Sequence, residues 1–441
     1  MWTPPAVSRC ASTLEAVPSI PSSPGGFTPR WIVRLVVVTA LVGVGAGVGG
    51  GLVYLGLHAI QHLAFGYSEG DFYEGLLDAP PVSRVVALAV AGVIGGVGWW
   101  ALRRWGARSP SHQVVSVEQT VGGRRMPALV TLINAALQVV IVGLGASIGR
   151  EVAPREVGAL WAGWLAERAG VSARERRILV ACGAGAGLAA VYNVPFGGAV
   201  FAVEILLAEV SFATVLPAFA TSAIAALVAR AVVPANPLYR LPELHLSPTI
   251  VVWSLLAGPL IGLTAVGFVR GARFAQNHRP TSWGILIVMP LTFVAVGIAS
   301  LWLPAILGNG RALGQLAFAA SLPLLVILLT TLVKAAATLG TIGAGAAGGT
   351  LTPSLAIGAG LGLAGGALWS HLWPGAELPA FALIGAAAFL AVTMRAPLTA
   401  LLLTMEFTGQ GPDLLVPVML SVAGAVAVGY LLERTRVTGV A

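Results

Sequence analysis

The stretch GLGASIGREVAP at residues 143–154 decides the fold, because GAGAAGGTLTP at residues 343–353 repeats its pattern. Each stretch has a glycine-rich approach followed by a proline, Pro154 or Pro353. Glycine is unfavourable in the interior of a helix, whereas proline is well tolerated in the first turn. Both stretches therefore predict a break between two helices, with a new helix beginning near the proline.

A second pair of matching blocks follows the first at nearly the same distance. YNVP at residues 192–195 is echoed by MRAP at residues 394–397, and a glutamate follows each proline by nine residues, Glu204 or Glu406. From the last glycine of the first block to the proline of the second is 46 residues in one half of the chain and 48 in the other. Two weak repeats with broken helices at corresponding places are typical of transporters, whose binding site lies between the repeats.

The composition indicates a membrane protein. Of the 441 residues, 57% are apolar and 10% are charged, and the mean hydropathy is +0.89. An ordinary soluble domain has about 25% charged residues, so this chain could not cover a soluble surface. The same numbers exclude disordered, coiled-coil and collagen-like proteins. We therefore expect an all-α integral membrane protein that crosses the membrane several times.

The apolar segments also suggest the domain organisation. Residues 1–30 are rich in Pro and Ser and predict a flexible tail without a cleavable signal. Residues 31–432 predict the transmembrane domain, with repeat 1 at about 31–233 and repeat 2 at about 248–432, before a short C-terminal tail at 433–441. Several segments are shorter than the roughly 20 residues of a spanning helix. Such interrupted helices have to meet inside the protein, usually around a polar cavity.

GREVAP places Glu151 at the start of a predicted helix. The free N–H groups and the dipole of a helix N-terminus both favour an anion. Glu151 can fill such a site as a tethered carboxylate or leave it to a free anion, so a proton and an anion can compete through one side chain. GGTLTP (348–353) has the same glycine-rich approach to a helix but no charged residue, and its backbone amides could face the same anion. The alternative is that Glu151 merely caps its own helix, paired with Arg150 or Arg155.

These blocks resemble the CLC family of chloride channels and proton-coupled anion transporters. GREVAP looks like the family's GREGP block, with Glu151 at the gating glutamate, and GGTLTP looks like its GGxFxP block, with Leu351 in place of the usual Phe. Residues 183–204, 394–406 and 307–310 match three further blocks. No single block is decisive, but their order and spacing together are specific.

The resemblance implies an inverted repeat of broken helices, in a homodimer whose subunits each have their own pore, surrounded by lipid in a prokaryotic cell membrane. The resemblance is to the prokaryotic type of the family, which implies a chain without C-terminal CBS domains. It implies chloride as the default cargo, and protons as a second cargo in an exchanger. It also implies that Glu151 swings in and out of an anion position as it is protonated. The anion would be held by the amides around Arg150, Glu151, Val152, Thr350 and Leu351.

One departure from the family concerns a serine that usually donates its hydroxyl to the anion. The family's GSGIP block is not visible, and the matching region reads GARSPSHQ at residues 106–113. Ser109 is the candidate, with Ser111 and the backbone near Pro110 as alternatives, and an ordinary polar loop is a further interpretation. Some relatives carry proline there and prefer nitrate, so a nitrate- or fluoride-selective protein stays open.

A second departure concerns the proton path. Many exchangers carry a glutamate one place after Glu204, where this chain has Ile205. One helix step turns a side chain by about 100°, so Glu204 is a poor substitute, and a carboxylate paired at a helix or dimer interface is the favoured interpretation of it. The departure favours a passive anion channel, or an exchanger with another proton route. Lys334, inside an apolar segment, could add positive potential to the path or snorkel to the membrane surface.

Other functional classes fit poorly. The net charge is +8, but the basic residues lie mostly at the ends of apolar segments, as beside anionic lipid, so no nucleic acid partner is expected. None of the six His has metal-ligand spacing, and Cys10 and Cys182 offer no zinc site, so we expect no metal and no cofactor beyond a bound anion. Glu151, Ser147 and Tyr192 form no recognisable nucleophile and base, so no enzyme is expected.

Overall fold

The computed structural model describes residues 29–67 and 70–438. By its internal contacts the chain forms two units, residues 1–37 and residues 38–441. Of the first unit, the described part is the opening of helix α1 (Pro29–Phe65); the rest of α1 and all later described elements belong to the second unit. The described residues contain no β-strand, and the all-α prediction is confirmed.

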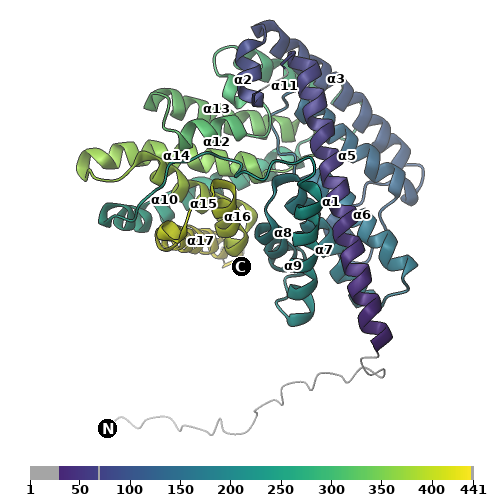
Figure 1. Ribbon diagram of the computed structural model, residues 1–441. Helices are drawn as coiled ribbons and strands as arrows, with labels where there is room; N and C mark the ends of the chain where they lie inside the picture. The colour runs from purple at the N-terminus through teal and green to yellow at the C-terminus, as the bar shows by residue number, and fades with distance from the viewer. Residues whose placement is uncertain (1–28, 68–69, 439–441) are drawn as a thin grey trace, which may run out of the picture. The chain divides into compact units, whose positions relative to one another are not determined.

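The helices fall into two sets that correspond to the two sequence repeats. The first set, after α1, is α2 (Phe72–Asp78), α3 (Pro81–Gly106), α4 (Val117–Val121), α5 (Ala128–Gly143), α6 (Val152–Arg168), α7 (Ala173–Tyr192), α8 (Pro195–Phe201) with its π-helical continuation (Ala202–Leu207), and α9 (Phe212–Ala229). The second set is α10 (Pro248–Asn277), α11 (Ile285–Ala299), α12 (Arg311–Phe318), α13 (Leu324–Gly343), α14 (Leu351–Leu372), α15 (Leu378–Met394), α16 (Pro397–Thr408) and α17 (Leu415–Thr438). In Figure 1, α8 and α16 lie side by side where the two sets meet, and they pack on each other, while α11 packs on α3.

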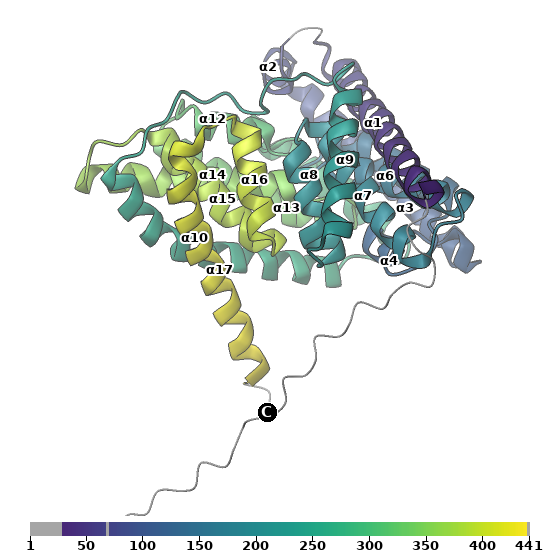
Figure 2. The same cartoon turned by 60° about the horizontal axis from the view of Figure 1, so that its bottom comes forward.

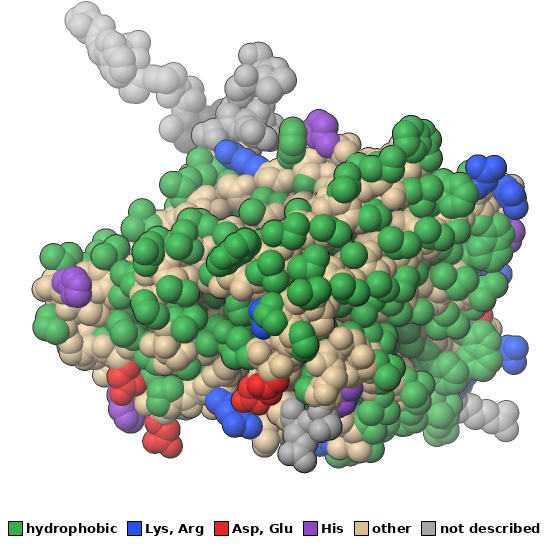
Figure 3. Space-filling model, turned by 90° about the horizontal axis from the view of Figure 1, so that it is seen from above, with side chains coloured by type: hydrophobic (Ala, Val, Ile, Leu, Met, Phe, Trp, Pro, Cys, Tyr) green, Lys and Arg blue, Asp and Glu red, His purple; other side chains and the backbone are tan. Residues whose placement is uncertain are grey.

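Seven of the described helices are long and apolar enough to cross a membrane. Five further apolar helices have only 10–17 residues, less than the roughly 20 that span a bilayer. Figure 3 shows a face with apolar side chains spread widely over it, and most of the charged side chains visible there lie near its edge. The prediction of an integral membrane protein with broken helices is confirmed.

The two predicted glycine-rich breaks are present, and they have the same backbone conformation. Residues 144–151 separate α5 from α6, and residues 344–350 separate α13 from α14. Gly145 has φ +101° and Gly345 has φ +97°, a left-handed conformation that glycine adopts without the strain a side chain would bring. The chain therefore turns at corresponding points of the two repeats.

Alanine at Gly345 is expected to destabilise the protein by about 1–2 kcal/mol, because an L-residue is strained at this positive φ. A matched control is Gly267→Ala in α10, where an added Cβ has no neighbour within 4 Å and replaces a glycine inside a helix. Thermal unfolding in detergent should show a lower midpoint for the first variant and an equal or higher one for the second. Equal midpoints for Gly345→Ala and the wild type would contradict the prediction.

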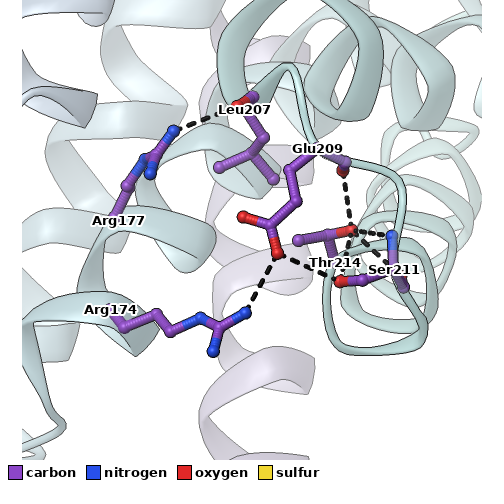
Figure 4. Close-up of polar contacts among 6 residues, drawn as sticks. All are labelled: Arg174, Arg177, Leu207, Glu209, Ser211 and Thr214. Carbon is purple, nitrogen blue, oxygen red and sulfur yellow. Dashed lines mark hydrogen bonds and ion pairs between the residues drawn. The ribbon is translucent and has the colours of Figure 1, made fainter. Parts of the chain in front are cut away.

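Two hydrogen bonds hold the connection between α8 and α9 against the start of α7 (Figure 4). Arg174 Nη2 donates to Glu209 Oε1 at 3.0 Å, and Arg177 Nη2 donates to the Leu207 carbonyl at 3.0 Å. The pair of Arg174 and Glu209 is exposed, and such pairs contribute at most about 1 kcal/mol. Its role is therefore geometric: it fixes the end of the helical segment that carries Glu204.

The ends of the chain differ from the predicted tails. Residues 1–28, most of the predicted flexible tail, lie outside the described residues, and α1 already begins at Pro29. At the other end α17 runs on to Thr438, so most of the predicted tail at 433–441 continues the last helix. Residues 439–441 lie outside the described residues.

Candidate anion and proton site

The two glycine-rich breaks meet each other in the second unit. The Gly149 N–H donates to the Gly349 carbonyl at 2.8 Å, and the Gly349 N–H donates back to the Gly149 carbonyl at 3.1 Å, which makes an isolated antiparallel bridge. Helix α6 begins at Val152 and α14 at Leu351, directly after the bridge. The N-termini of two helices, one from each repeat, therefore come together at this point.

Glu151 reaches across the bridge to the other repeat. Its Oε1 accepts the backbone N–H of Leu351 at 2.6 Å, and its Oε2 lies 3.5 Å from the Thr352 hydroxyl. The side chain is buried, with 1% exposure. The interpretation in which Glu151 caps its own helix is wrong, because it makes no capping hydrogen bond to α6. The carboxylate instead fills the N-terminus of α14, a position where amides and dipole favour negative charge.

On one side of Glu151 lies a cavity of about 610 Å³, the first cavity. Arg150 lines it and is otherwise buried, with its guanidinium carbon 4.8 Å from the ring centre of Tyr192 and 5.9 Å from that of Tyr54. Arg240 and Arg311 line the same cavity. Asp71 and Glu74 line it too, so the three arginines leave one positive charge in excess, which favours anions.

On the other side lies a cavity of about 500 Å³, the second cavity. It is lined by Val152 and Thr350, beside the contact of Glu151 with α14. Charged side chains also line it: Glu118, Arg155, Glu156, Arg273 and Arg279. The first cavity draws on α2, which lies at the top of Figure 2, and the second on α4, which lies lower on its right-hand side. Glu151 lines neither cavity, but its neighbours in the chain do: Arg150 lines the first and Val152 the second.

The serines predicted to bind the anion lie elsewhere. Ser109 is half-buried and Ser111 is exposed in the connection after α3; their hydroxyls are 2.8 Å apart, and neither lines the first or the second cavity. Ser116 lines the second cavity and caps α4, accepting the Gln119 N–H at 3.3 Å. The sequence analysis missed Ser116, although the pattern SVEQ at residues 116–119 is a capping box that marks a helix start.

Lys334 is fully buried, so the snorkelling interpretation is wrong. Its Nζ donates to Ser147 Oγ at 2.9 Å and to the carbonyls of Ile306 and Gly308 at 2.9 and 2.7 Å. It lines neither cavity. Lys334 thus ties α13 to Ser147 in the first glycine-rich break and to the Ile306 and Gly308 carbonyls.

Glu204, in the first repeat, caps a helix of the second repeat, and Glu406, in the second repeat, caps a helix of the first. Glu204 accepts the N–H groups of Leu398 and Thr399 at 3.0 and 2.7 Å, at the start of α16. Glu406, in α16, accepts the first free N–H groups of α8 at 3.0 and 2.6 Å. Of the interpretation of Glu204 as a carboxylate paired at a helix or dimer interface, the helix interface is confirmed, between the segment that carries Glu204 and α16. This reciprocal exchange is what a two-fold relation between inverted repeats produces.

Among the described residues, no three His, Cys, Asp or Glu side chains come together in a way that could hold a metal ion. Near the bridge lie the buried Glu151 carboxylate and the arginines of the two cavities, with further carboxylates at Asp71 and Glu74 in the first cavity and at Glu118 and Glu156 in the second. An arrangement of this kind can bind an anion at the helix starts and can carry a proton on a carboxylate.

Comparison with known proteins agrees with this geometry. The family model described as "Voltage gated chloride channel" matches residues 88–430. The chain belongs to this family. A "Putative chloride channel protein ClcB-like" of Ralstonia nicotianae is 30% identical over 356 residues, which cover 77% of this chain and 80% of the relative. A "Voltage-gated ClC-type chloride channel ClcB" of Citrobacter koseri is 29% identical and covers 77% of this chain and 83% of the relative.

Two solved structures share the fold of this CLC protein. A slow cyanobacterial Cl⁻/H⁺ antiporter has a TM-score of 0.78 at 23% identity and covers 91% of this chain and 98% of its own. A CLC-type fluoride/proton antiporter has a TM-score of 0.71 at 20% identity and covers 91% and 97%. The predicted family and fold are confirmed, and the family is one of anion transport proteins of membranes.

Proposed function

We propose that this CLC protein exchanges chloride for protons along a path gated by Glu151. The observation that carries the proposal is the buried Glu151 carboxylate on the Leu351 N–H, with Arg150 in the first cavity and Val152 in the second on either side of it in the chain. A carboxylate and a free anion favour the same amides, so they exclude each other. A proton on Glu151 neutralises the carboxylate and weakens its hold on that amide. Each proton therefore favours the entry of an anion.

The bound anion lies at the two helix starts, next to the amides of Arg150, Glu151 and Val152 and those of Thr350 and Leu351. Ser116 supplies the hydroxyl, since it shares the second cavity with Val152 and Thr350. Its bond to the Gln119 N–H uses an oxygen lone pair, so its O–H can still donate to an anion. Chloride is the cargo we propose, and nitrate and fluoride are the alternatives to be compared.

Ser116→Ala is expected to weaken chloride binding about tenfold, because a hydrogen bond to a charged group contributes about 1.5 kcal/mol or more. Calorimetric titration of the purified protein with chloride measures this. Ser111→Ala is the matched control, because Ser111 is exposed and lines neither the first nor the second cavity. Equal affinities for the two variants would remove Ser116 from the anion site.

A passive anion channel is the second candidate. Ile205 favours it, because many exchangers of the family carry a glutamate at this position. Liposomes loaded with chloride, with valinomycin and potassium clamping the voltage, separate the two functions. Exchange predicts that a chloride gradient drives protons against their own gradient. Chloride flux without proton movement would make the protein a channel. If chloride, nitrate and fluoride were all immobile, the anion transport proposed for Glu151 and its path would be wrong.

We further propose a homodimer in the plasma membrane of a bacterium, with the second cavity facing the cytoplasm. The similar ClcB proteins are bacterial. Arg273 and Arg279 line the second cavity, and basic residues gather at cytoplasmic ends of membrane helices. Phe196 and Leu398, at the starts of α8 and α16, are 54% and 59% exposed in the single chain and free to face a second copy. Light scattering with the detergent mass subtracted should give twice the mass of one chain.

A further inference from the structure

A second buried carboxylate lies on the same helix as the gate. Glu156 of α6 is 4% exposed. The Asn134 amide nitrogen donates to its two oxygens at 2.9 and 3.0 Å, and the Gln138 amide nitrogen donates to Oε2 at 3.1 Å. Trp99 Nε1 in turn donates to the Asn134 carbonyl oxygen at 2.9 Å. Three helices, α3, α5 and α6, thus combine to hold one carboxylate.

This carboxylate is placed where water and the gate are both close. Glu156 lines the second cavity, which also reaches Val152 and Thr350 beside the contact of Glu151 with α14. Five residues along a helix rise by about 7.5 Å, so water in the cavity can bridge the two glutamates. An ionisable side chain kept at membrane depth is a candidate for function, because its burial is costly.

The surroundings of Glu156 can satisfy both of its protonation states. In the described part of the chain, the Gln138 amide oxygen is buried and has no hydrogen-bond partner, although its amide nitrogen donates to Glu156. A neutral carboxylic acid carries an O–H donor, whereas a carboxylate only accepts. Rotation of the Gln138 amide by about 180° turns its free oxygen toward Glu156, where it can accept this O–H.

The charged groups around Glu156 come from two neighbouring helices and from α6 itself. Arg155 of α6 pairs with Glu118 of α4 at 3.0 Å, and the Glu118 side chain is 58% exposed. Arg273 and Arg279 of α10 line the same cavity. The packed face of α5 offers amides only, Asn134 and Gln138. The arginines stabilise the ionised state, so Glu156 can release a proton as well as take one.

We propose that Glu156 is the proton-exchange group of the second cavity. It takes a proton from water in that cavity onto a carboxylate oxygen, and gives it through cavity water to the Glu151 carboxylate when this turns away from Leu351. The reverse sequence returns the proton to the second cavity. No other bond forms or breaks. The proposal rests on the exchange function proposed above.

The test uses the full chain in liposomes, with chloride flux and proton movement recorded together. Glu156→Gln is expected to lower proton movement at least about tenfold while chloride flux stays within about twofold, because the anion amides are untouched. Glu167→Gln removes the same charge near the end of α6, where Glu167 pairs with Arg125 and Arg176 and lines neither cavity, and it should change neither rate by more than about twofold. Glu156→Asp keeps a titratable group and should restore part of the proton movement.

The outcomes separate this proposal from the function on which it rests. If the wild type moves chloride without protons, exchange itself fails, and Glu156 with it. If the wild type exchanges protons and Glu156→Gln does so equally well, only the role of Glu156 is overturned. An equal loss of both fluxes in a protein with wild-type thermal stability would also overturn it. Should Glu156→Gln fail to fold, Gln138→Leu provides the test, because it keeps the Glu156 carboxylate but removes the amide oxygen that accepts its proton. Unchanged proton movement in Gln138→Leu would then refute the role of Glu156.

Discussion

Glu151→Gln is expected to abolish proton movement, by at least about a hundredfold or about 2.7 kcal/mol, while chloride still crosses the membrane. The glutamine amide has the shape of the protonated side chain and can still accept the Leu351 N–H through its oxygen. It carries no charge and takes up no proton, so it competes weakly for the helix start. Wild-type chloride flux should rise as the pH falls, because protonation frees the anion position, and the flux of the variant should not respond to pH.

The matched control is Glu406→Gln, which changes the same side chain at the start of a different helix. Glu406 accepts the N–H groups of Phe196 and Gly197, far along the chain from the bridge between the breaks. The Glu406→Gln variant should have a lower unfolding temperature and an unchanged ratio of chloride to protons transported. Proton movement that survives in Glu151→Gln, measured in the same liposomes, would contradict the role of Glu151 as the gate.

The sequence predicts the gate because its signals are local. Gly145 and Gly345 mark the two breaks by their positions in matching stretches, and the left-handed φ at both explains why glycine is needed. The glutamate of GREVAP is likewise visible as an acid beside a helix start. Pattern alone was enough to propose that an anion and a carboxylate compete there.

The hydrogen-bond partner of Glu151 could not be predicted from the sequence in the same way. Glu151 binds the N–H of Leu351, 200 residues away in the chain, and no spacing rule says whether a carboxylate caps its own helix or another one. Sequence spacing from Glu151 favoured Ser109, but the loop before α4 places Ser116 in the second cavity instead. Glu156 was not singled out at all, because the amides that hold it come from α5, 18 and 22 residues earlier. Contacts between helices decide all three cases.

Lys334→Met is expected to lower the free energy of unfolding by about 3 kcal/mol or more. The variant leaves the carbonyls of Ile306 and Gly308 buried without the Nζ donor, and each unsatisfied group costs about 1–3 kcal/mol, whereas Ser147 Oγ keeps its contact with Thr338 Oγ1 at 3.3 Å. Thermal unfolding in detergent measures the loss. Chloride titration of the same sample reports on the bridge, since Ser147 lies two residues before Gly149.

Lys334→Gln distinguishes the hydrogen bonds of Lys334 from its charge. Both variants remove the positive charge, but glutamine keeps an N–H₂ donor that can reach part of the same set. If Lys334 acts by holding the segment before the bridge, the glutamine variant should unfold at a temperature between those of the wild type and Lys334→Met, with chloride affinity following stability. A similar fall in chloride affinity for both variants, with the stability of Lys334→Gln preserved, would show instead that the charge attracts the anion. Because Lys334 lines neither cavity, we expect the first result.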